Sequence, residues 1–177
     1  MIRIEKNRVM DDCKNLGWLV RAMAKTHDTD TKYRVDVIRS IGGELVATDC
    51  RRLHVLDIKG TRLEELLPEG YYEVSKCTKT IVVLYKVKDE YRISYPDYIP
   101  FFKNEGSKID IPNGKDALEH GLTTVYRNTK CDAVNHRYLI DVIDDDSAFT
   151  LDVEESNIKP LIFRNCTKRA AVMPMRF

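Results

Sequence analysis

Apolar and polar residues first alternate and then change period at the start of the chain. The opening MIRIE alternates apolar with charged side chains, which predicts a short β-strand. From Asn7 to about Lys25 apolar residues recur every three or four positions, which predicts an amphipathic helix with Asn7 as its N-cap. The apolar face of this helix comprises Val9, Cys13, Leu16, Val20 and Met23. The opposite face is expected to carry Lys14, Trp18, Arg21 and Lys25.

Strand patterns dominate residues 33–96. A tight hairpin is predicted at Gly42-Gly43, because both glycines tolerate positive φ, and a further strand is expected over residues 53–58. Three more strands are predicted over YYEVSK, TIVVLYKV and DEYRISYP. The segment KNEG at 103–106 then resembles a linker.

The second part of the chain repeats the order of strand, helix and several strands. IDI at 109–111 predicts a short strand, and helices are expected over residues 116–127 and 136–144. Three strands follow, in AFTLDV, KPLIFRN and KRAAVMPM. The pattern predicts an α+β protein built from repeated units of helix plus antiparallel sheet.

Composition narrows the class of protein. The chain has 177 residues, of which 43% are apolar and 32% charged, which favours a globular protein over a disordered or membrane one. The N-terminus lacks the apolar core of a signal peptide, so a cytoplasmic protein without membrane contact is expected. The net charge is +1, so any nucleic-acid contact requires a local basic patch. The five cysteines are scattered without the spacing of a metal or redox motif, and no cofactor is expected.

Three stretches resemble one family. LVATDCRRLHVLDI at 45–58 is similar to the "VATDGHRLAV" hairpin of bacterial sliding clamps, the DNA polymerase III beta subunit. YPDYIPFF at 95–102 resembles the family's "FPDY" segment. RYLIDVI at 137–143, followed by the terminal AVMPMRF, resembles the family's last helix and its "VVMPMRL" end. The three matches occur in the family's order.

The resemblance implies a DNA-clamp-like fold and a non-enzymatic role in DNA replication. Sliding clamps close around duplex DNA and give processivity to polymerases and repair factors. These partners insert a linear peptide, a glutamine followed by leucine- and phenylalanine-like residues, into an apolar pocket. Carried over by position, that pocket would use Val35, Thr48, Arg52, Leu53, Pro96, Phe101, Val172, Met173, Pro174, Met175, Arg176 and Phe177. Methionine would give it walls that adapt to several peptides.

The chain also departs from the family, whose members have three domains. Residues 1–102 resemble the middle domain and residues 107–177 resemble the end of the last domain, so the first domain is expected to be absent. The match is expected to span about half of a family member. Cys50 and Arg51 replace the glycine and histidine of the family's turn, which changes the pocket rim. A ring would require a homo-oligomer.

Basic residues on the helices are the candidate DNA contacts. Clamps of this family line their hole with helices whose cations touch phosphates without reading bases. The positions expected to do so here are Arg8, Lys14, Arg21, Lys25, Lys115, Arg127 and Arg137. The alternative is a solvated helix face, which charged stripes often form.

Two other functions remain open at the level of sequence. A metal-dependent nuclease would use clustered carboxylates, since Mg²⁺ prefers oxygen ligands. The acidic residues available for it are Asp141, Asp144, Asp145, Asp146, Asp152 and Glu154, although successive aspartates are also typical of loops. The second alternative is a regulatory module or decoy that keeps the peptide pocket without forming a ring. The four histidines are far apart in sequence, and His54, on a predicted strand, is expected to be structural.

Overall fold

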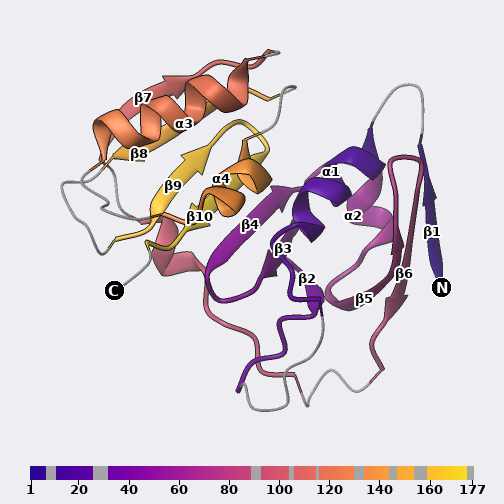
Figure 1. The fold of residues 1–177 in the computed structure, drawn as a ribbon. Coiled ribbons are helices and arrows are strands. Elements are labelled where there is room, and N and C mark those ends of the chain that lie inside the picture. Colours follow the sequence, from indigo (N-terminus) through magenta and orange to yellow (C-terminus); the bar gives the residue numbers. More distant parts are fainter. Residues whose placement is uncertain are drawn as a thin grey trace. The chain divides into compact units, whose positions relative to one another are not determined.

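The computed structural model describes residues 1–6, 11–25, 32–88, 93–103, 106–114, 116–129, 134–143, 147–153 and 159–174. These residues divide into two compact units (Figure 1). The first comprises Met1–Cys50 and His54–Pro96, and the second comprises Arg51–Leu53 and Asp97–Phe177. Among the described residues, no helix has both the length and the apolar character needed to cross a membrane.

The described residues of the first unit form six antiparallel strands of sheet and two α-helices. Its strands lie side by side in the order β1-β6-β5-β2-β3-β4. In chain order its elements are β1 (Ile2–Glu5), α1 (Asp12–Val20), β2 (Val37–Ile41), β3 (Glu44–Thr48), β4 (Arg52–Asp57), α2 (Arg62–Leu66), β5 (Gly70–Cys77) and β6 (Ile81–Lys86).

The β2–β3 hairpin forms where turn chemistry predicts it. Gly42 and Gly43 have φ values of +58° and +78°, a region that L-residues with side chains rarely adopt. Ile41 consequently lies opposite Glu44 in the antiparallel ladder. An added Cβ at Gly43 would also lie 2.4 Å from the exposed Lys59 side chain, which would have to move, so the conformation of this turn is the main reason for glycine.

The first helix is shorter than the sequence pattern predicts. The described helix begins at Asp12, and the Asp11 side chain caps it by accepting a hydrogen bond from the Lys14 N–H at 3.0 Å. The predicted cap Asn7 and the residues up to Met10 lie outside the described residues. Because α1 ends at Val20, the expected helical extension to Lys25 is wrong.

Two further differences concern short or irregular segments. Helix α2 was not predicted, since five residues are too few to establish a helical period. Residues 93–96 are not a strand, although DEYRISYP was expected to form one, and residues 89–92 lie outside the described residues. Two separate hydrogen bonds, not a ladder, connect this segment to the rest of the unit. The Arg34 N–H donates to the Ser94 carbonyl at 2.9 Å, and the Tyr95 hydroxyl donates to the Val46 carbonyl at 3.0 Å.

In the second unit, the part of the chain that the structure describes forms four antiparallel strands of sheet and two α-helices. Its strand order is β10-β9-β8-β7, and α3 lies along β7 and β8 while α4 lies beside β10 (Figure 1). The predicted helices and strands of this part are confirmed. In chain order the elements are η2 (Ile99–Phe102, a 3-10 helix), β7 (Ser107–Ile111), α3 (Ala117–Asn128), α4 (His136–Val142), β8 (Phe149–Val153), β9 (Leu161–Arg164) and β10 (Lys168–Val172).

Helix α3 packs very closely on its neighbours. Gly121 is buried in α3, and a Cβ added there would lie 2.6 Å from Ile143 Cδ1 and 3.2 Å from Ile111 Cγ2. Glycine therefore allows the helix to approach its core at this point. Both units combine an antiparallel sheet with packed helices, so the predicted α+β class is confirmed.

Candidate functional site

The segment Arg51–Leu53 lies against the final strand of the second unit. The Met173 N–H, immediately after β10, donates a hydrogen bond to the Arg51 carbonyl at 2.9 Å. Leu53 is 6% exposed and Val172 is fully buried. Two of the stretches that carry the family resemblance, distant in sequence, therefore meet in the structure.

Arg52 is anchored on helix α4. Its guanidinium lies over the Tyr138 ring, 4.6 Å from the centroid, and it forms an ion pair with Asp141. The Arg52 side chain is 14% exposed, so these contacts hold a largely buried cation. Sequence reasoning did not assign Tyr138 to the site and treated Asp141 as a candidate metal ligand. Their i, i+3 spacing in α4 is a signal that could have indicated a shared helix face.

The remaining pocket candidates of the second unit differ in exposure. Met173 and Pro174 are half-buried, whereas Phe101 on η2 is 37% exposed and its neighbour Ile99 is 56% exposed. Val172 is a core residue, so it can shape this region but cannot touch a ligand in this conformation. Met175, Arg176 and Phe177 lie outside the described residues.

Val35, Thr48 and Pro96 belong to the first unit. Val35 and Thr48 are each 5% exposed, and Pro96 is half-buried. The Thr48 hydroxyl accepts a hydrogen bond from the Cys50 N–H at 3.0 Å and so closes the turn in which Cys50 has φ of +67°. Burial raises the pKa of the Cys50 thiol, and the neighbouring Asp49 raises it further. This cysteine therefore stays a neutral thiol in a backbone position that favours glycine.

The predicted polar face of α1 is interrupted by its tryptophan. Trp18 is 1% exposed and stacks on His54 of β4, with the ring centroids 4.2 Å apart and the ring planes at 18°. The expectation that Trp18 lies on an exposed stripe is therefore wrong, because the indole is part of the core. His54 is fully buried, and its Nδ1 lies 2.9 Å from the Trp18 carbonyl oxygen, which is consistent with its predicted structural role.

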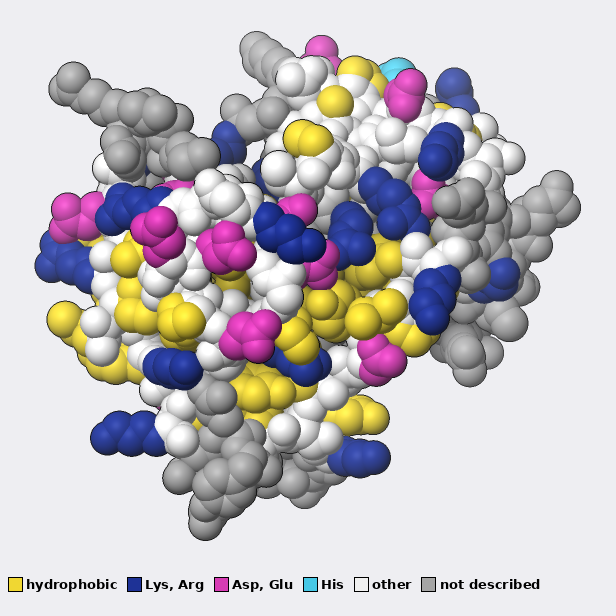
Figure 2. Space-filling model, turned by 180° about the vertical axis from the view of Figure 1, so that it is seen from behind, with side chains coloured by type: hydrophobic (Ala, Val, Ile, Leu, Met, Phe, Trp, Pro, Cys, Tyr) yellow, Lys and Arg dark blue, Asp and Glu magenta, His cyan; other side chains and the backbone are white. Residues whose placement is uncertain are grey.

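The described DNA-contact candidates are mostly accessible. Arg21, Lys25, Arg127 and Arg137 are exposed and Lys14 is half-buried, whereas Arg8 and Lys115 lie outside the described residues. Figure 2 shows Lys and Arg side chains mixed with Asp and Glu side chains over the face that it draws. A phosphate-binding surface would therefore depend on local groups of cations, consistent with the net charge of +1.

Two carboxylates of the nuclease hypothesis lie among the described residues, and each interacts with an arginine. Asp152 is 3% exposed and accepts a hydrogen bond from Arg164 Nε at 2.6 Å, while Asp141 is paired with Arg52. Within the described part of the chain, no three His, Cys, Asp or Glu residues are grouped so that they could hold a metal ion. Asp144, Asp145, Asp146 and Glu154 lie outside that part.

Comparison with solved structures identifies the fold. No protein-family model matches the chain, and no curated protein matches it by sequence. The whole chain superposes on the DNA polymerase III subunit beta of Pseudomonas aeruginosa with a TM-score of 0.53 and 18% identity. It superposes on the DNA polymerase sliding clamp of Bacillus subtilis with a TM-score of 0.57 and 13% identity over 99% of the chain. The Helicobacter pylori beta clamp bound to a DNA ligase peptide gives a TM-score of 0.55 and 13% identity, also over 99% of the chain.

The chain has the fold of the bacterial DNA polymerase III beta sliding clamps. This confirms the resemblance that the sequence stretches indicate, at the level of the fold. The chain spans 64% to 66% of the length of these three clamp chains, which is more than the half expected from sequence.

Proposed function

We propose that this protein is a sliding-clamp-like processivity factor of DNA replication or repair. It docks linear peptide motifs of polymerase or repair partners, encircles duplex DNA as a homo-oligomer and performs no chemistry itself. The clamp fold supports the class of function. The observation that carries the proposal is the junction between Arg51–Leu53 and the end of β10, where two clamp-like stretches meet.

The docking surface would be apolar with a cationic rim. Burying a leucine and a phenylalanine of the peptide would contribute roughly 1.5–3 kcal/mol each. Ordering a flexible peptide opposes this gain, so we expect a modest affinity and rapid exchange between partners. Pro174 limits the backbone freedom of the terminal segment, and Arg176 would offer donors to peptide carbonyls or acids.

The DNA contact would be electrostatic and independent of sequence. Exposed Arg21, Lys25, Arg127 and Arg137 could pair with phosphates without reading bases. Such binding releases counterions, so the affinity is expected to fall steeply as the salt concentration rises. Equal binding of duplexes of unrelated sequence, with this salt dependence, is the expected result.

A second candidate is a clamp-derived module that docks peptides without forming a ring. Such a module would use the same junction between Arg51–Leu53 and the end of β10, and it would not require a closed oligomer. Retention on nicked circular DNA, lost when the circle is cut, would favour the encircling protein. A monomer that binds the peptide but is retained on neither the circular nor the cut DNA would favour the module.

The docking surface is tested by placing a charge in it. Met175→Asp should abolish binding of a fluorescent peptide containing glutamine, leucine and phenylalanine, because an unpaired carboxylate in an apolar site is costly. Thr167→Asp, at an exposed turn position between β9 and β10, is the matched control and should bind normally. Unchanged anisotropy titrations for Met175→Asp, with circular dichroism showing both variants folded, would refute the assignment.

A further inference from the structure

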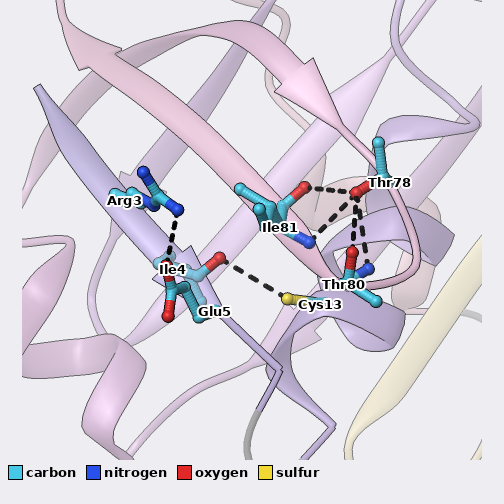
Figure 3. A network of polar contacts seen from close by, with 7 residues as sticks. All are labelled: Arg3, Ile4, Glu5, Cys13, Thr78, Thr80 and Ile81. Atoms are coloured by element: carbon cyan, nitrogen blue, oxygen red, sulfur yellow. Dashed lines mark hydrogen bonds and ion pairs between the residues drawn. The ribbon is translucent and has the colours of Figure 1, made fainter.

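Arg39 of β2 differs from two other arginines of the first unit in having no acidic partner. Arg3 of β1 forms an ion pair with Glu5 at 2.7 Å (Figure 3). Arg34, which precedes β2, forms an ion pair with Glu73 at 2.6 Å. Among the described residues, no carboxylate pairs with Arg39, and its guanidinium makes no hydrogen bond. The positive charge of Arg39 is therefore available to a ligand.

Two tyrosine rings hold the Arg39 guanidinium in place. Its central carbon lies 5.9 Å from the ring centroid of Tyr71 on β5 and 5.9 Å from that of Tyr95, and the two centroids are 6.0 Å apart. All three side chains are half-buried. A cation–π contact uses no N–H group as a hydrogen-bond donor, so the guanidinium keeps its fork of donors for an anion.

The acidic residue on this part of the sheet is already engaged. Arg39 lies opposite Tyr71 in the β2–β5 ladder, and Glu73 is two residues further along β5, so Glu73 shares the sheet face with Arg39. The Arg34 guanidinium holds Glu73 through its hydrogen bond at 2.6 Å. Moving Glu73 to Arg39 would break that bond, and an anion from outside the chain would not.

The opposite face of β2 is closed. Ile38 is fully buried and Ser40 is 5% exposed. The Ser40 hydroxyl donates to the carbonyl of Leu67, directly after α2, at 2.7 Å. Because side chains alternate along a strand, Arg39 lies on the face away from α2, and a ligand can reach it from that side.

The cluster of Arg39, Tyr71 and Tyr95 borders the first-unit part of the proposed docking surface. Arg39 lies opposite Val46 in the β2–β3 ladder, so Thr48, two residues along β3, lies on the same face. The Tyr95 hydroxyl donates to the Val46 carbonyl at 3.0 Å, and Tyr95 directly precedes Pro96. A peptide seated at Thr48 and Pro96 would therefore have the Arg39 guanidinium beside it.

We propose that Arg39, with Tyr71 and Tyr95, binds a carboxylate of an acidic segment that flanks the docking motif in the partner peptide. A carboxylate accepts two parallel hydrogen bonds from the planar guanidinium fork. The two rings already restrict the guanidinium, so binding costs less side-chain entropy. This inference rests on the proposed function, because the docking motif brings the acidic segment to β2. Among partners that share the docking surface, the site favours those with an acidic flank.

Fluorescent peptides with matched flanks measure what the carboxylates contribute. Each peptide contains glutamine, leucine and phenylalanine, and carries three aspartates or three asparagines either before or after this motif. One of the two acidic peptides should bind the whole chain about tenfold more tightly than its asparagine counterpart, because charge-assisted hydrogen bonds are stronger than neutral ones. Anisotropy titrations give the affinities.

Substitutions in the cluster assign the gain to Arg39. Arg39→Gln should remove it while leaving the binding of the asparagine peptides unchanged. Arg39→Lys should keep only part of the gain, because an ammonium lacks the planar fork. Tyr71→Leu should also lower it, since the ring no longer holds the guanidinium. Arg62→Gln, at the exposed start of α2, matches the loss of charge and should keep the full gain.

The outcomes separate this site from the docking function. If the asparagine peptides bind and the acidic ones gain nothing, or if the gain survives in Arg39→Gln, the site is refuted while docking stands. If no peptide binds the wild type, the docking function fails and the site with it. A single-stranded oligothymidine that binds the wild type but not Arg39→Gln, with no gain for acidic peptides, would assign the cluster to nucleic acid instead. Circular dichroism checks that each variant is folded.

Discussion

One aromatic group of the first unit and one of the second have different surroundings. In the first, Trp18 and His54 are stacked and essentially inaccessible. In the second, Phe102 is half-buried, with the guanidinium carbons of Arg164 and Arg169 at 5.5 Å and 4.9 Å from its ring centroid. The Trp18–His54 stack therefore helps to build a core, whereas the Phe102 ring lies beside two cations near the surface. Substitutions in the stack should mainly affect folding, and substitutions around Phe102 should affect surface contacts more.

The largest expected effect is the loss of the buried stack. Trp18→Ala should lower the free energy of unfolding by about 3–5 kcal/mol, because it removes the indole and leaves a cavity beside His54. Urea unfolding followed by circular dichroism measures this, since the chain's one tryptophan is lost. Tyr126→Ala in α3, whose tyrosine is 55% exposed, is the control and should cost less than about 0.5 kcal/mol. Equal losses of unfolding free energy in the two variants would contradict the expected difference between a buried and an exposed aromatic side chain.

Arg52 should give the next largest effect. Arg52→Ala removes the contact with Tyr138 and leaves Asp141 without its ion-pair partner, so it should cost about 1–3 kcal/mol of stability. Arg52→Lys should cost less, because it keeps the charge but not the planar fork. A double-mutant cycle with Asp141→Asn isolates the pair in urea unfolding. Additive losses would show that the two residues do not couple.

Replacing Cys50 should have a smaller and favourable effect. Cys50→Gly places glycine where φ is +67°, which should stabilise the first unit by about 1 kcal/mol. Cys166→Gly is the control, because Cys166 is also exposed but does not have positive φ. Thermal unfolding under reducing conditions distinguishes them, and an equal or lower melting temperature for Cys50→Gly would contradict the assignment of strain.

The smallest effect concerns Asp12 at the start of α1. Burial raises the pKa of this carboxyl, an effect that Arg62 partly offsets and Asp11 reinforces. A raised pKa in the folded state means that ionisation disfavours folding, so the stability contributed by this group is lost as the pH rises from about 4 through the raised pKa. Asp12→Asn should therefore be more stable than the wild type at neutral pH and should approach it in acid. A difference that does not change with pH would refute this reading.

Local turn chemistry and periodic patterns were sufficient for much of the fold. The glycine pair at 42 and 43 fixed the hairpin, and the 3.6-residue period located α3 and α4 to within a few residues. The short helix α2 could not be predicted this way, because five residues are too few to establish a period. The irregular residues 93–98 could not be predicted either, because hydrogen bonds to distant residues, such as that from Tyr95 to Val46, hold this segment.

The candidate site was predicted in part. The family resemblance indicated that Arg52, Leu53 and the final strand belong together, and the bond from Met173 to Arg51 joins these segments. The roles of Tyr138 and Asp141 escaped prediction, because an arginine can be matched with many acids and rings when only the sequence is known. The burial of Trp18 escaped it as well, since helical spacing indicates which residues share a face but not which faces are covered.

The missing side chain at position 121 predicts how relatives of this protein should vary. Any larger residue there would clash with Ile143 and Ile111, so substitutions at position 121 are expected to be coupled to substitutions at positions 143 and 111. A homologue with alanine at the equivalent of position 121 is therefore expected to carry a shorter residue, such as valine or alanine, at the equivalent of position 143. Such paired substitutions would indicate that α3 packs equally closely in homologues known only from their sequences.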